Sequence, residues 1–405
     1  MKHPWIPAEP LSKPLFDAVR RRVIFDCNKW DPQFADGCVI ARAPLVIRRD
    51  SWMEVSRLAS ALAREALAAE AEILNRPQLH RQLGLSRTVR RALRRVTRVG
   101  PASGTARLIR FDFHFTQDGW RISEANTDVP GGLNEAAGLP KVVGPHYPWA
   151  SAVGDPAGAY VEAIAEGFGA GATVALVHAT AYSDDQQMMA FFARRLGAAG
   201  LIPLLASPAH LRWLGRRAHL ETPWWRGALD AIVRFFPGDW LPHLPRVCGW
   251  PQLFAGGMTP VSNPPAALFV QSKRFPLVWE SLKTSLPTWR ALLPETRDPR
   301  SVPWQTDDEW IIKPALGRAG EGVGIKSLVE PKAWRQILHG ARWFPGSWVA
   351  QRRFRTAPAE VGDLPMYPCL GVFTIGDRVV GAYGRMAPRP LIDAHAQDAA
   401  VLTAA

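Results

Sequence analysis

Alternation of apolar and polar residues over 108–115 and 120–126 predicts two neighbouring β-strands. The stretches LIRFDFHF and WRISEAN each place apolar side chains at every second position, as a strand with one face in a core requires. Gln117, Asp118 and Gly119 between them are turn residues, and a three-residue loop with Gly119 in the left-handed conformation is a common hairpin connection. The segment is therefore expected to form a β-hairpin.

The loop length decides which polar side chains of this hairpin share a face. A three-residue loop sets the register so that Asp112 faces Glu124 and Arg110 faces Asn126. Because side chains alternate with a period of two, all of these groups then project from one side of the ribbon. A two-residue loop would instead place the pairs on opposite faces.

Periodic apolar positions predict helices before the hairpin. Residues 51–75 carry an apolar stripe, with Ser51 as a candidate N-cap and Glu54 three residues later. A second, strongly basic helix is expected at 87–98. It could contact a phosphate backbone, but we interpret it as a solvent-exposed face, since runs of charge on helices usually are.

After residue 172 the pattern changes to strand, helix, strand and indicates a parallel βαβ unit over 172–206. Ser183 is a candidate N-cap followed by two acids, and Gly200 is a candidate C-terminal stop. No GxGxxG sequence follows the first strand, so a dinucleotide site is not indicated. Residues 222–265 are rich in Trp, Pro and Gly and are interpreted as a connecting region, after which strands and turns dominate.

Composition indicates a folded protein with more than one subdomain. The 405 residues are too many for one ordinary core, and a hydrophobic content of 47% with 17 Trp and 17 Phe supplies core material. The net charge of +13 would attract an anionic partner such as a nucleotide, nucleic acid or membrane surface. Only nine of the 49 basic residues are Lys and 40 are Arg, a skew that coding bias also produces. The scarce lysines are therefore the more informative basic residues.

Cysteine spacing and segment polarity argue against several classes of protein. The four cysteines are scattered, with no CxxC pair and no His at metal-ligand spacing, which argues against a disulfide framework and a zinc site. Residues 1–14 contain Pro where a signal peptide needs an apolar run, and no later stretch approaches the roughly 18 apolar residues of a membrane span. We therefore expect a cytoplasmic protein without membrane association.

The predicted hairpin brings oxygen donors to one point. Carboxylates that face each other across a ribbon repel unless a cation lies between them. Asp112, Glu124 and Asn126 carry the oxygen donors that Mg²⁺ accepts, usually with waters and substrate phosphates completing its coordination. The alternative is a surface hairpin on which Arg110 simply pairs with the acids.

A glycine-rich segment later in the chain is typical of phosphate binding. Residues 310–326 read as a strand ending at Lys313 and a loop that can wrap phosphates with backbone N–H groups through Gly317, Gly320, Gly322 and Gly324. Lys313, and Lys273 earlier in the chain, would supply charge for phosphate oxygens. The spacing fits neither a Walker A loop nor a protein-kinase loop.

These motifs, in their order along the chain, resemble the glutathionylspermidine synthase family. The similar segments are Arg-Phe-Asp-Phe and Glu-x-Asn-x-Asp-x-Pro between Arg110 and Glu135, VRFFPGDWL at 233–241, SKRFPLVWESL at 272–282, Lys-Pro-x-x-Gly-Arg-x-Gly at 313–320 and WVAQRRF at 348–354. The resemblance implies an α/β (α+β) fold, namely a circularly permuted ATP-grasp with a Rossmann-like pre-ATP-grasp βαβ region and a helical N-terminal part.

The resemblance also implies a division of the chain into regions. Residues 1–105 lie outside the similar segments, and the helical patterns found above make them a partly helical N-terminal region. Residues 106–170 would form the metal-binding hairpin segment of the ATP-grasp. Residues 171–265 would form the Rossmann-like pre-ATP-grasp domain, and 266–405 the ATP-grasp nucleotide-binding domain.

Individual residues acquire expected roles from the same resemblance. Asp112, Glu124 and Asn126 would hold Mg²⁺, while Arg110 and Arg385 would be catalytic and face the reacting phosphate. The nucleotide would be bound by Lys273, Lys313, Gly317, Arg318, Gly320, Gly322 and Gln351. Gln351 is the candidate for adenine contact, and the 317–324 loop would close over the phosphates.

The implied activity is that of an ATP- and Mg²⁺-dependent carboxylate–amine ligase that forms an amide through an acyl phosphate. Its partners would be a small-molecule or peptide carboxylate and an amine, with neither a membrane nor nucleic acid expected despite the basic charge. Two alternatives stay open: a kinase-like phosphotransferase on the same scaffold, and a non-catalytic nucleotide- or nucleic-acid-binding protein that uses residues 87–98. The His residues, His114 and His178 included, are interpreted as packing or surface residues.

Overall fold

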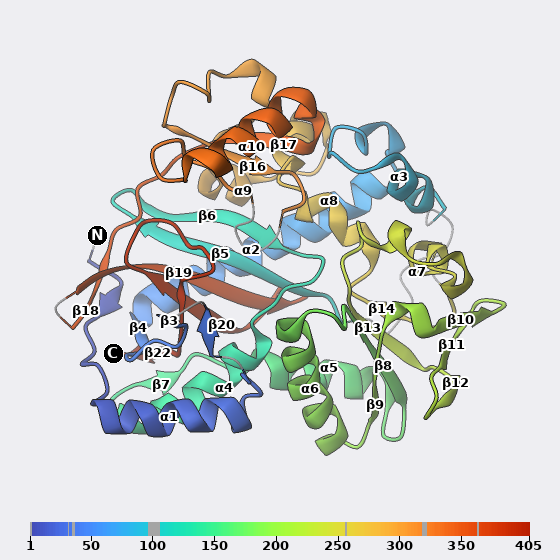
Figure 1. Ribbon diagram of the computed structural model, residues 1–405, viewed down its shortest axis with the longest axis horizontal. Coiled ribbons are helices and arrows are strands. Elements are labelled where there is room, and N and C mark those ends of the chain that lie inside the picture. The colour runs from blue at the N-terminus through green and yellow to red at the C-terminus, as the bar shows by residue number, and fades with distance from the viewer. Residues whose placement is uncertain are drawn as a thin grey trace.

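An antiparallel sheet built from both halves of the chain lies at the centre of the molecule. The computed structural model describes residues 2–30, 32–34, 37–95, 106–255, 257–317, 322–362 and 364–405. The central sheet has the strand order β21-β20-β19-β5-β6, with β18 beside β19 (Figure 1). Its strands are β5 (Leu108–Thr116), β6 (Gly119–Asn126), β18 (Ala359–Val361), β19 (Leu364–Ile375), β20 (Arg378–Ala387) and β21 (Gln397–Ala399).

The predicted hairpin is β5–β6, but the predicted three-residue loop is wrong. Thr116 pairs with Gly119, so only Gln117 and Asp118 form the turn, and Gly119 has a positive φ of 94°. Such a short loop alone would put the predicted pairs on opposite faces. A β-bulge restores the register, because Ser123 is an extra residue without a partner on β5.

Beyond the bulge, Asp112 pairs with Glu124 and Arg110 with Asn126, so the predicted pairing is confirmed. The alternative of a surface hairpin is wrong, because every residue of β5 is buried. Phe111 packs into the main hydrophobic core on one face of the sheet. Since side chains alternate along a strand, the polar residues occupy the other face.

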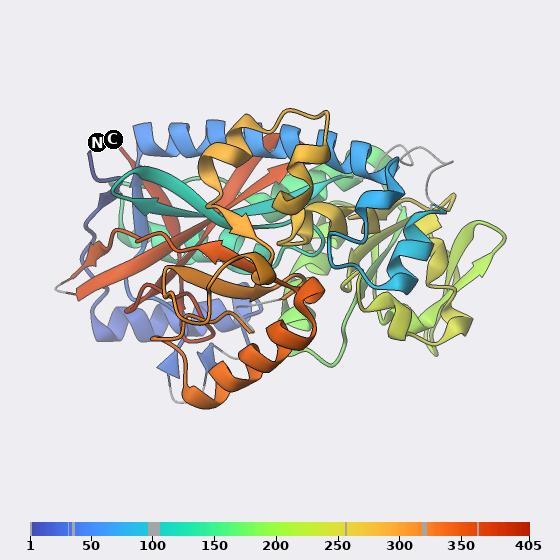
Figure 2. The same ribbon diagram turned by 90° about the horizontal axis from the view of Figure 1, so that it is seen from above.

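Helices lie on both sides of the central sheet. Figure 2 shows α2 (Arg49–Leu74, light blue) on one side and α10 (Pro331–Trp343, orange) on the other. α2 buries Val55, Leu62 and Ala66 in the same core as the sheet. Arg48 occupies the N-cap position without a side-chain hydrogen bond, so the prediction that Ser51 caps this helix is wrong. The predicted basic helix is α3 (Arg87–Leu93), and its predicted residues 96–98 lie outside the described part of the chain.

The predicted βαβ unit is confirmed. β8 (Thr173–His178) and β9 (Ile202–Ala206) pair in parallel and are joined by α6 (Ser183–Ala198). Tyr182, not Ser183, occupies the N-cap position of α6. The region 222–265 is more than a connection, because β13 (Ala231–Phe235) and β14 (Val261–Ser262) extend this parallel sheet to the order β14-β13-β8-β9.

A small antiparallel sheet carries the strand that precedes the glycine-rich segment. Its order is β15 (Thr296–Arg297), β17 (Trp348–Arg352) and β16 (Trp310–Pro314). Trp310 and Ile312 of β16 pack in one hydrophobic cluster with Trp334 of α10. Lys313 therefore belongs to a strand, as predicted, and the strand ends one residue later, at Pro314.

The two ends of the chain meet in a further sheet. β4 (Leu45–Arg48) pairs in parallel with β22 (Val401–Ala404), and the N and C termini lie on the same side of the molecule in Figures 1 and 2. No helix in the described residues is both long and apolar enough to span a bilayer.

The remaining α-helices and strands are α1 (Lys13–Asp26), α4 (Leu133–Val143), α5 (Pro156–Phe168), α7 (Pro251–Ala255), α8 (Leu268–Gln271), α9 (Pro287–Leu292), β1 (Trp5–Ile6), β2 (Gln33–Phe34), β3 (Gly37–Cys38), β7 (Ser151–Ala152), β10 (Leu211–Leu214), β11 (Arg217–Glu221) and β12 (Arg226–Ala228).

Candidate active site

The polar face of the hairpin presents an arginine bound to a carboxylate. Arg110 donates through Nε and Nη2 to the two carboxylate oxygens of Asp112 at 2.7 and 2.9 Å, and through Nη1 to the Gly131 carbonyl at 2.7 Å. Its guanidinium also lies over the Tyr383 ring, 5.5 Å from the centroid. This arrangement needs a glycine at Gly371 on β19, where a Cβ atom would lie 2.8 Å from Arg110 Cδ.

The other predicted metal ligands lie beside this pair. Glu124 Oε2 is 3.0 Å from the Lys273 ammonium. Asn126 Nδ2 donates to Asp112 Oδ2 at 3.2 Å and to Glu124 Oε1 at 3.5 Å. Burial alone would raise the pKa of Glu124, but Lys273 and Lys313 lower it to about 2, so the group is a carboxylate at neutral pH.

The donor chemistry of Asp112, Glu124 and Asn126 fits a magnesium ion. Rotating the Asn126 amide by half a turn would present its oxygen at the point where the nitrogen now meets both acids. Within the described part of the chain, no group of three or more His, Cys, Asp or Glu side chains is arranged to hold a metal. Mg²⁺ does not require such a group, because it commonly takes one or two carboxylates and completes its shell with waters and phosphates.

Lys313 approaches the same acids from β16. Its ammonium donates to Gln351 Oε1 at 2.7 Å and to the Ser123 carbonyl at 3.3 Å. Burial lowers the pKa of Lys313 to about 8, although Glu124 opposes the shift. Gln351 Nε2 donates in turn to Thr296 Oγ1 at 3.1 Å. Gln351 thus supports Lys313 and is absent from the described walls of the two cavities around the site.

The glycine-rich segment begins within hydrogen-bonding distance of Lys273. The Gly317 carbonyl accepts a hydrogen bond from Lys273 Nζ at 3.2 Å. Gly322 has a positive φ of 68°, a conformation that other residues rarely adopt. Arg318 and Gly320, two of the predicted nucleotide ligands, lie outside the described residues.

Two cavities meet beside the hairpin, at Glu124 and Arg385. The larger, of about 370 Å³, extends from Arg110, Asn126 and Gly317 to a second polar cluster formed by Lys29, Glu135 and Asp398. The smaller, of about 110 Å³, is lined by Asp112, His114, Lys313 and Cys369 together with the apolar side chains of Ile311, Val323, Ile325 and Ile392. Glu124 and Arg385 line both cavities and therefore form their common boundary.

Sequence reasoning missed several residues of the site. His114 is buried and lines the smaller cavity, with Nε2 3.0 Å from Ser123 Oγ, and burial lowers its pKa to about 4. Its position two residues after Asp112 could have indicated the shared face. Tyr383, two residues before Arg385 on β20, lines the larger cavity together with it. Lys29 carries no signal in the sequence beyond the scarcity of lysines.

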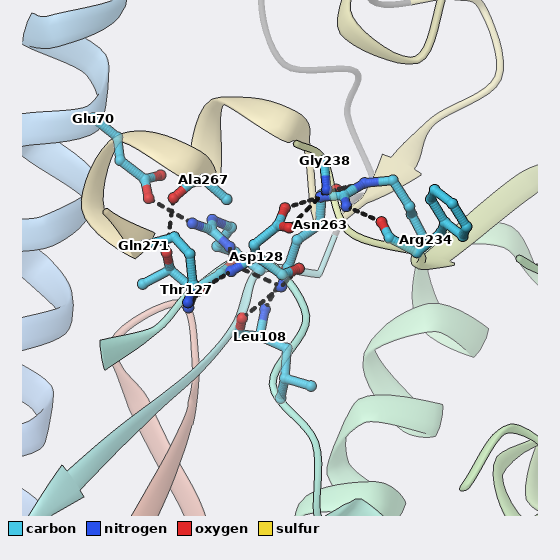
Figure 3. Close-up of polar contacts among 11 residues, drawn as sticks. Glu70, Leu108, Thr127, Asp128, Arg234, Gly238, Asn263, Ala267 and Gln271 are labelled. Atoms are coloured by element: carbon cyan, nitrogen blue, oxygen red, sulfur yellow. Dashed lines mark hydrogen bonds and ion pairs between the residues drawn. The ribbon is translucent and has the colours of Figure 1, made fainter. Parts of the chain in front are cut away.

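A buried polar network, of which Asp128 and Gln271 also line the larger cavity, anchors the end of the hairpin (Figure 3). Gln271 Oε1 accepts from the backbone N–H groups of Thr127 and Asp128 at 2.8 and 3.0 Å. The Asp128 carboxylate pairs with Arg234 of β13, whose side chain is fully buried. The chain that follows Asn126 is therefore tied both to α8 and to the parallel sheet.

The fold and the site define a mixed α/β protein in which a parallel βαβ sheet adjoins an antiparallel sheet that carries paired acids and arginines. Residues 45–397 match the family model described as glutathionylspermidine synthase preATP-grasp, and the chain belongs to that family. The predicted family and fold class are confirmed.

Other comparisons are more distant. A solved structure from Methylobacillus flagellatus KT, assigned provisionally as a gamma-glutamylcysteine synthetase, is similar at 13% identity over 84% of this chain and 88% of that one, with a TM-score of 0.44. A likeness of that size supports no argument about function. No curated protein sequence matches the chain.

Proposed function

We propose that this protein is an ATP- and Mg²⁺-dependent carboxylate–amine ligase that forms an amide bond through an acyl phosphate. The observation that carries the proposal is the meeting of two cavities at Glu124 and Arg385, beside the buried pair of Arg110 and Asp112. A ligase of this kind must bring the γ-phosphate of ATP next to the substrate carboxylate and amine, so the nucleotide and the two substrates need adjoining binding cavities. Membership of a synthase family agrees with this assignment.

The smaller cavity is assigned to the nucleotide. Ile311, Val323 and Ile325 would offer apolar contacts to a base, while Lys313 and Lys273 lie near the boundary where phosphates would pass. Ammonium groups at that boundary stabilise phosphate oxygens. In this proposal Gln351 positions Lys313 and does not contact adenine, a revision that follows from its hydrogen bonds.

Asp112, Glu124 and Asn126 would hold Mg²⁺, which when bound neutralises charge on phosphate oxygens. The protein's own cations hold these acids: Lys273 and Lys313 keep Glu124 ionised, and Arg110 binds Asp112 in an ion pair. Glu124 is therefore in the carboxylate form that a hard divalent cation requires.

The larger cavity is assigned to the acid and the amine. The substrate carboxylate attacks the γ-phosphorus of ATP, releasing ADP and forming an acyl phosphate, and the amine nitrogen then displaces phosphate. Negative charge gathers on the transferred phosphoryl group, and Arg110 and Arg385 are placed beforehand to stabilise it. Leu316 and Gly317, at the start of the glycine-rich segment, line this cavity, and in this proposal the segment serves to keep water from the acyl phosphate.

A substrate screen with product identification tests the proposal. The protein is incubated with ATP, Mg²⁺ and pairs drawn from panels of carboxylic acids and amines, and ADP is measured. We expect ADP release to coincide with a product whose mass equals acid plus amine less water. A phosphorylated acceptor without amide would establish the kinase-like alternative. Salt-dependent nucleic-acid binding without ATP turnover would favour a binding protein.

A further inference from the structure

Arg385 is held differently from the other arginine of the site. Within the described part of the chain, its guanidinium forms no ion pair and donates no hydrogen bond. Arg110, by contrast, is bound to Asp112 and to the Gly131 carbonyl. A long side chain without an anchor loses conformational freedom when it binds an anion, which weakens that binding. Prior orientation of Arg385 therefore depends on its other contacts.

Arg385 contacts an aromatic ring. Its guanidinium carbon lies over the Tyr383 ring, 5.9 Å from the centroid. The two residues are two apart on β20, so their side chains project from the same face of the sheet. A guanidinium within about 6 Å of an aromatic centroid is attracted by the negative potential of the ring face, more strongly where water is excluded. Tyr383 can therefore orient Arg385 without neutralising it.

Tyr383 is itself held by several contacts. Its hydroxyl donates a hydrogen bond to Asp398 of β21. The Arg110 guanidinium lies over the same ring, 5.5 Å from the centroid. Gly132, with a φ of 89°, packs against the ring so closely that a Cβ atom there would lie 2.7 Å from Tyr383 Cδ1. The ring is thus a fixed surface for Arg385.

A glycine on the intervening strand lets Arg110 reach this ring. β19 lies between β5 and β20, and Gly371 pairs with Asp112 on one side and with Tyr383 on the other. The Arg110 side chain passes over Gly371, where a Cβ atom would meet it. Asp112, Arg110 and Tyr383 therefore form a row across three strands that leads to Arg385.

We propose that Tyr383 is a positioning residue for Arg385: its ring orients the guanidinium at the boundary of the two cavities before the nucleotide binds. Arg385 lines both cavities, so an oriented guanidinium there can meet the γ-phosphate as the nucleotide enters. Groups that are already oriented stabilise phosphate charge without rearrangement. This inference rests on the proposed function for the contact between Arg385 and the γ-phosphate of ATP.

A purely structural role for Tyr383 gives a different expectation. Tyr383 lines the larger cavity and is absent from the described walls of the smaller one, which is assigned to the nucleotide. A general loss of packing would weaken the binding of ATP and ADP alike. Loss of orientation at Arg385 would affect the γ-phosphate alone, so only the preference for ATP over ADP would fall.

Calorimetric titration of the full chain with ATP and with ADP, both in the presence of Mg²⁺, tests the proposal. Wild type should bind ATP more tightly than ADP. In Tyr383→Leu this preference should fall by about fivefold to tenfold, while the affinity for ADP should stay within about twofold.

Tyr383→Phe is the matched variant, because it keeps the ring and removes only the hydroxyl. Burial, together with Asp398, raises the pKa of Tyr383, so the hydroxyl is neutral at pH 7 and carries no charge that Phe would lack. Tyr383→Phe should therefore keep the preference for ATP within about twofold of wild type.

A double-mutant cycle shows whether Tyr383 acts through Arg385. Arg385→Met should reduce the preference for ATP at least as much as Tyr383→Leu does. Combining the two changes should then reduce it no further, because residues that act through one contact are not additive. A preference that survives in Tyr383→Leu, an equal loss of ADP affinity, an equal loss in Tyr383→Phe or a further loss in the double variant would each overturn the proposal.

Gly132→Ala supplies an independent measurement if Tyr383→Leu does not fold. The added Cβ would displace the Tyr383 ring, so the preference for ATP should again fall by about fivefold. Gly171→Ala is its matched control, since Gly171 has a similar φ of 79° but a Cβ there meets nothing within 4 Å. Equal preference for ATP in these two variants would contradict the proposal.

Failure of this inference is distinguishable from failure of the proposed function. A wild type that binds neither nucleotide would contradict both. A wild type that prefers ATP, with the same preference in Tyr383→Leu, would contradict the inference alone. Nucleotide binding needs neither the acid nor the amine, so the result does not depend on the identity of these substrates.

Discussion

Individual acids of the site are each bound to a cation before any substrate arrives. Asp112 is held by Arg110 and Glu124 by Lys273, at distances of 2.7 and 3.0 Å. Charged groups that are already oriented require little rearrangement when phosphate charge develops between them. The charge of Lys313 is sensitive to pH, because burial lowers its pKa to about 8.

Affinity for ATP is therefore expected to fall as the pH rises above about 8. Lys313 of the free protein loses its proton through that range, since its pKa is lowered to about 8, and phosphate binding then requires proton uptake. In Lys313→Arg the guanidinium stays charged, so the affinity should be nearly constant from about pH 7 to about pH 9. Calorimetric titrations across this range measure the effect. A wild-type affinity that is flat over the same range would show that Lys313 does not contact the phosphates.

Among the elements, the hairpin shows how far sequence patterns can predict this site. Its strands and its polar face followed from alternation, but the loop was predicted one residue too long and the bulge was not predicted at all. The two errors compensate, because Ser123 supplies the offset that an extra loop residue would have supplied. No local pattern marks Ser123, whose hydroxyl is 3.0 Å from His114 on the neighbouring strand.

Gly371→Ala tests whether β19 must leave room for Arg110. The added Cβ would lie 2.8 Å from Arg110 Cδ and 3.1 Å from Nε, which would push the guanidinium off Asp112. We expect ADP release to fall by about tenfold or more, with a stability loss of roughly 1–3 kcal/mol. Gly197→Ala is the control, because a Cβ there meets nothing within 4 Å. Equal ADP release in both variants would mean that the position of Arg110 is not critical.

On the scale of the whole molecule, the site depends on contacts between distant segments. The hairpin pairs with β19, Lys313 comes from β16, and Lys29 comes from the N-terminal segment. Long-range pairing of this kind is decided by tertiary packing and has no local pattern. The motif order predicted the family, whereas the cluster around Lys29 and the support of Lys313 by Gln351 became visible only in three dimensions.

The polar network of Figure 3 joins the central sheet to the parallel sheet. Asn263, next to β14, accepts from the Leu108 N–H at 2.9 Å and donates to the Leu108 carbonyl at 2.7 Å, in the manner of a further strand. Asp128 accepts from the Gly238 N–H at 2.9 Å in addition to pairing with Arg234. The hairpin is thus held at its open end by side chains of the neighbouring sheet.

Asp128→Asn is expected to destabilise the protein by roughly 3–5 kcal/mol, because it leaves the fully buried Arg234 guanidinium without its counter-ion. Urea unfolding monitored by circular dichroism measures this loss. Glu280→Gln, which breaks an exposed ion pair with Arg290, should change the stability little. Similar unfolding midpoints for the two variants would show that the network does not hold the sheets together.

The most direct test of the central claim, that the hairpin face binds the metal and nucleotide, is the Mg²⁺ dependence of ATP binding. Calorimetry compares wild type, Asp112→Asn and Asp118→Asn, the last an exposed acid in the turn of the same hairpin. We predict that Mg²⁺ strengthens ATP binding to wild type and to Asp118→Asn, and that Asp112→Asn loses this gain while remaining folded by circular dichroism. A folded Asp112→Asn protein that retains the full gain from Mg²⁺ would contradict the account.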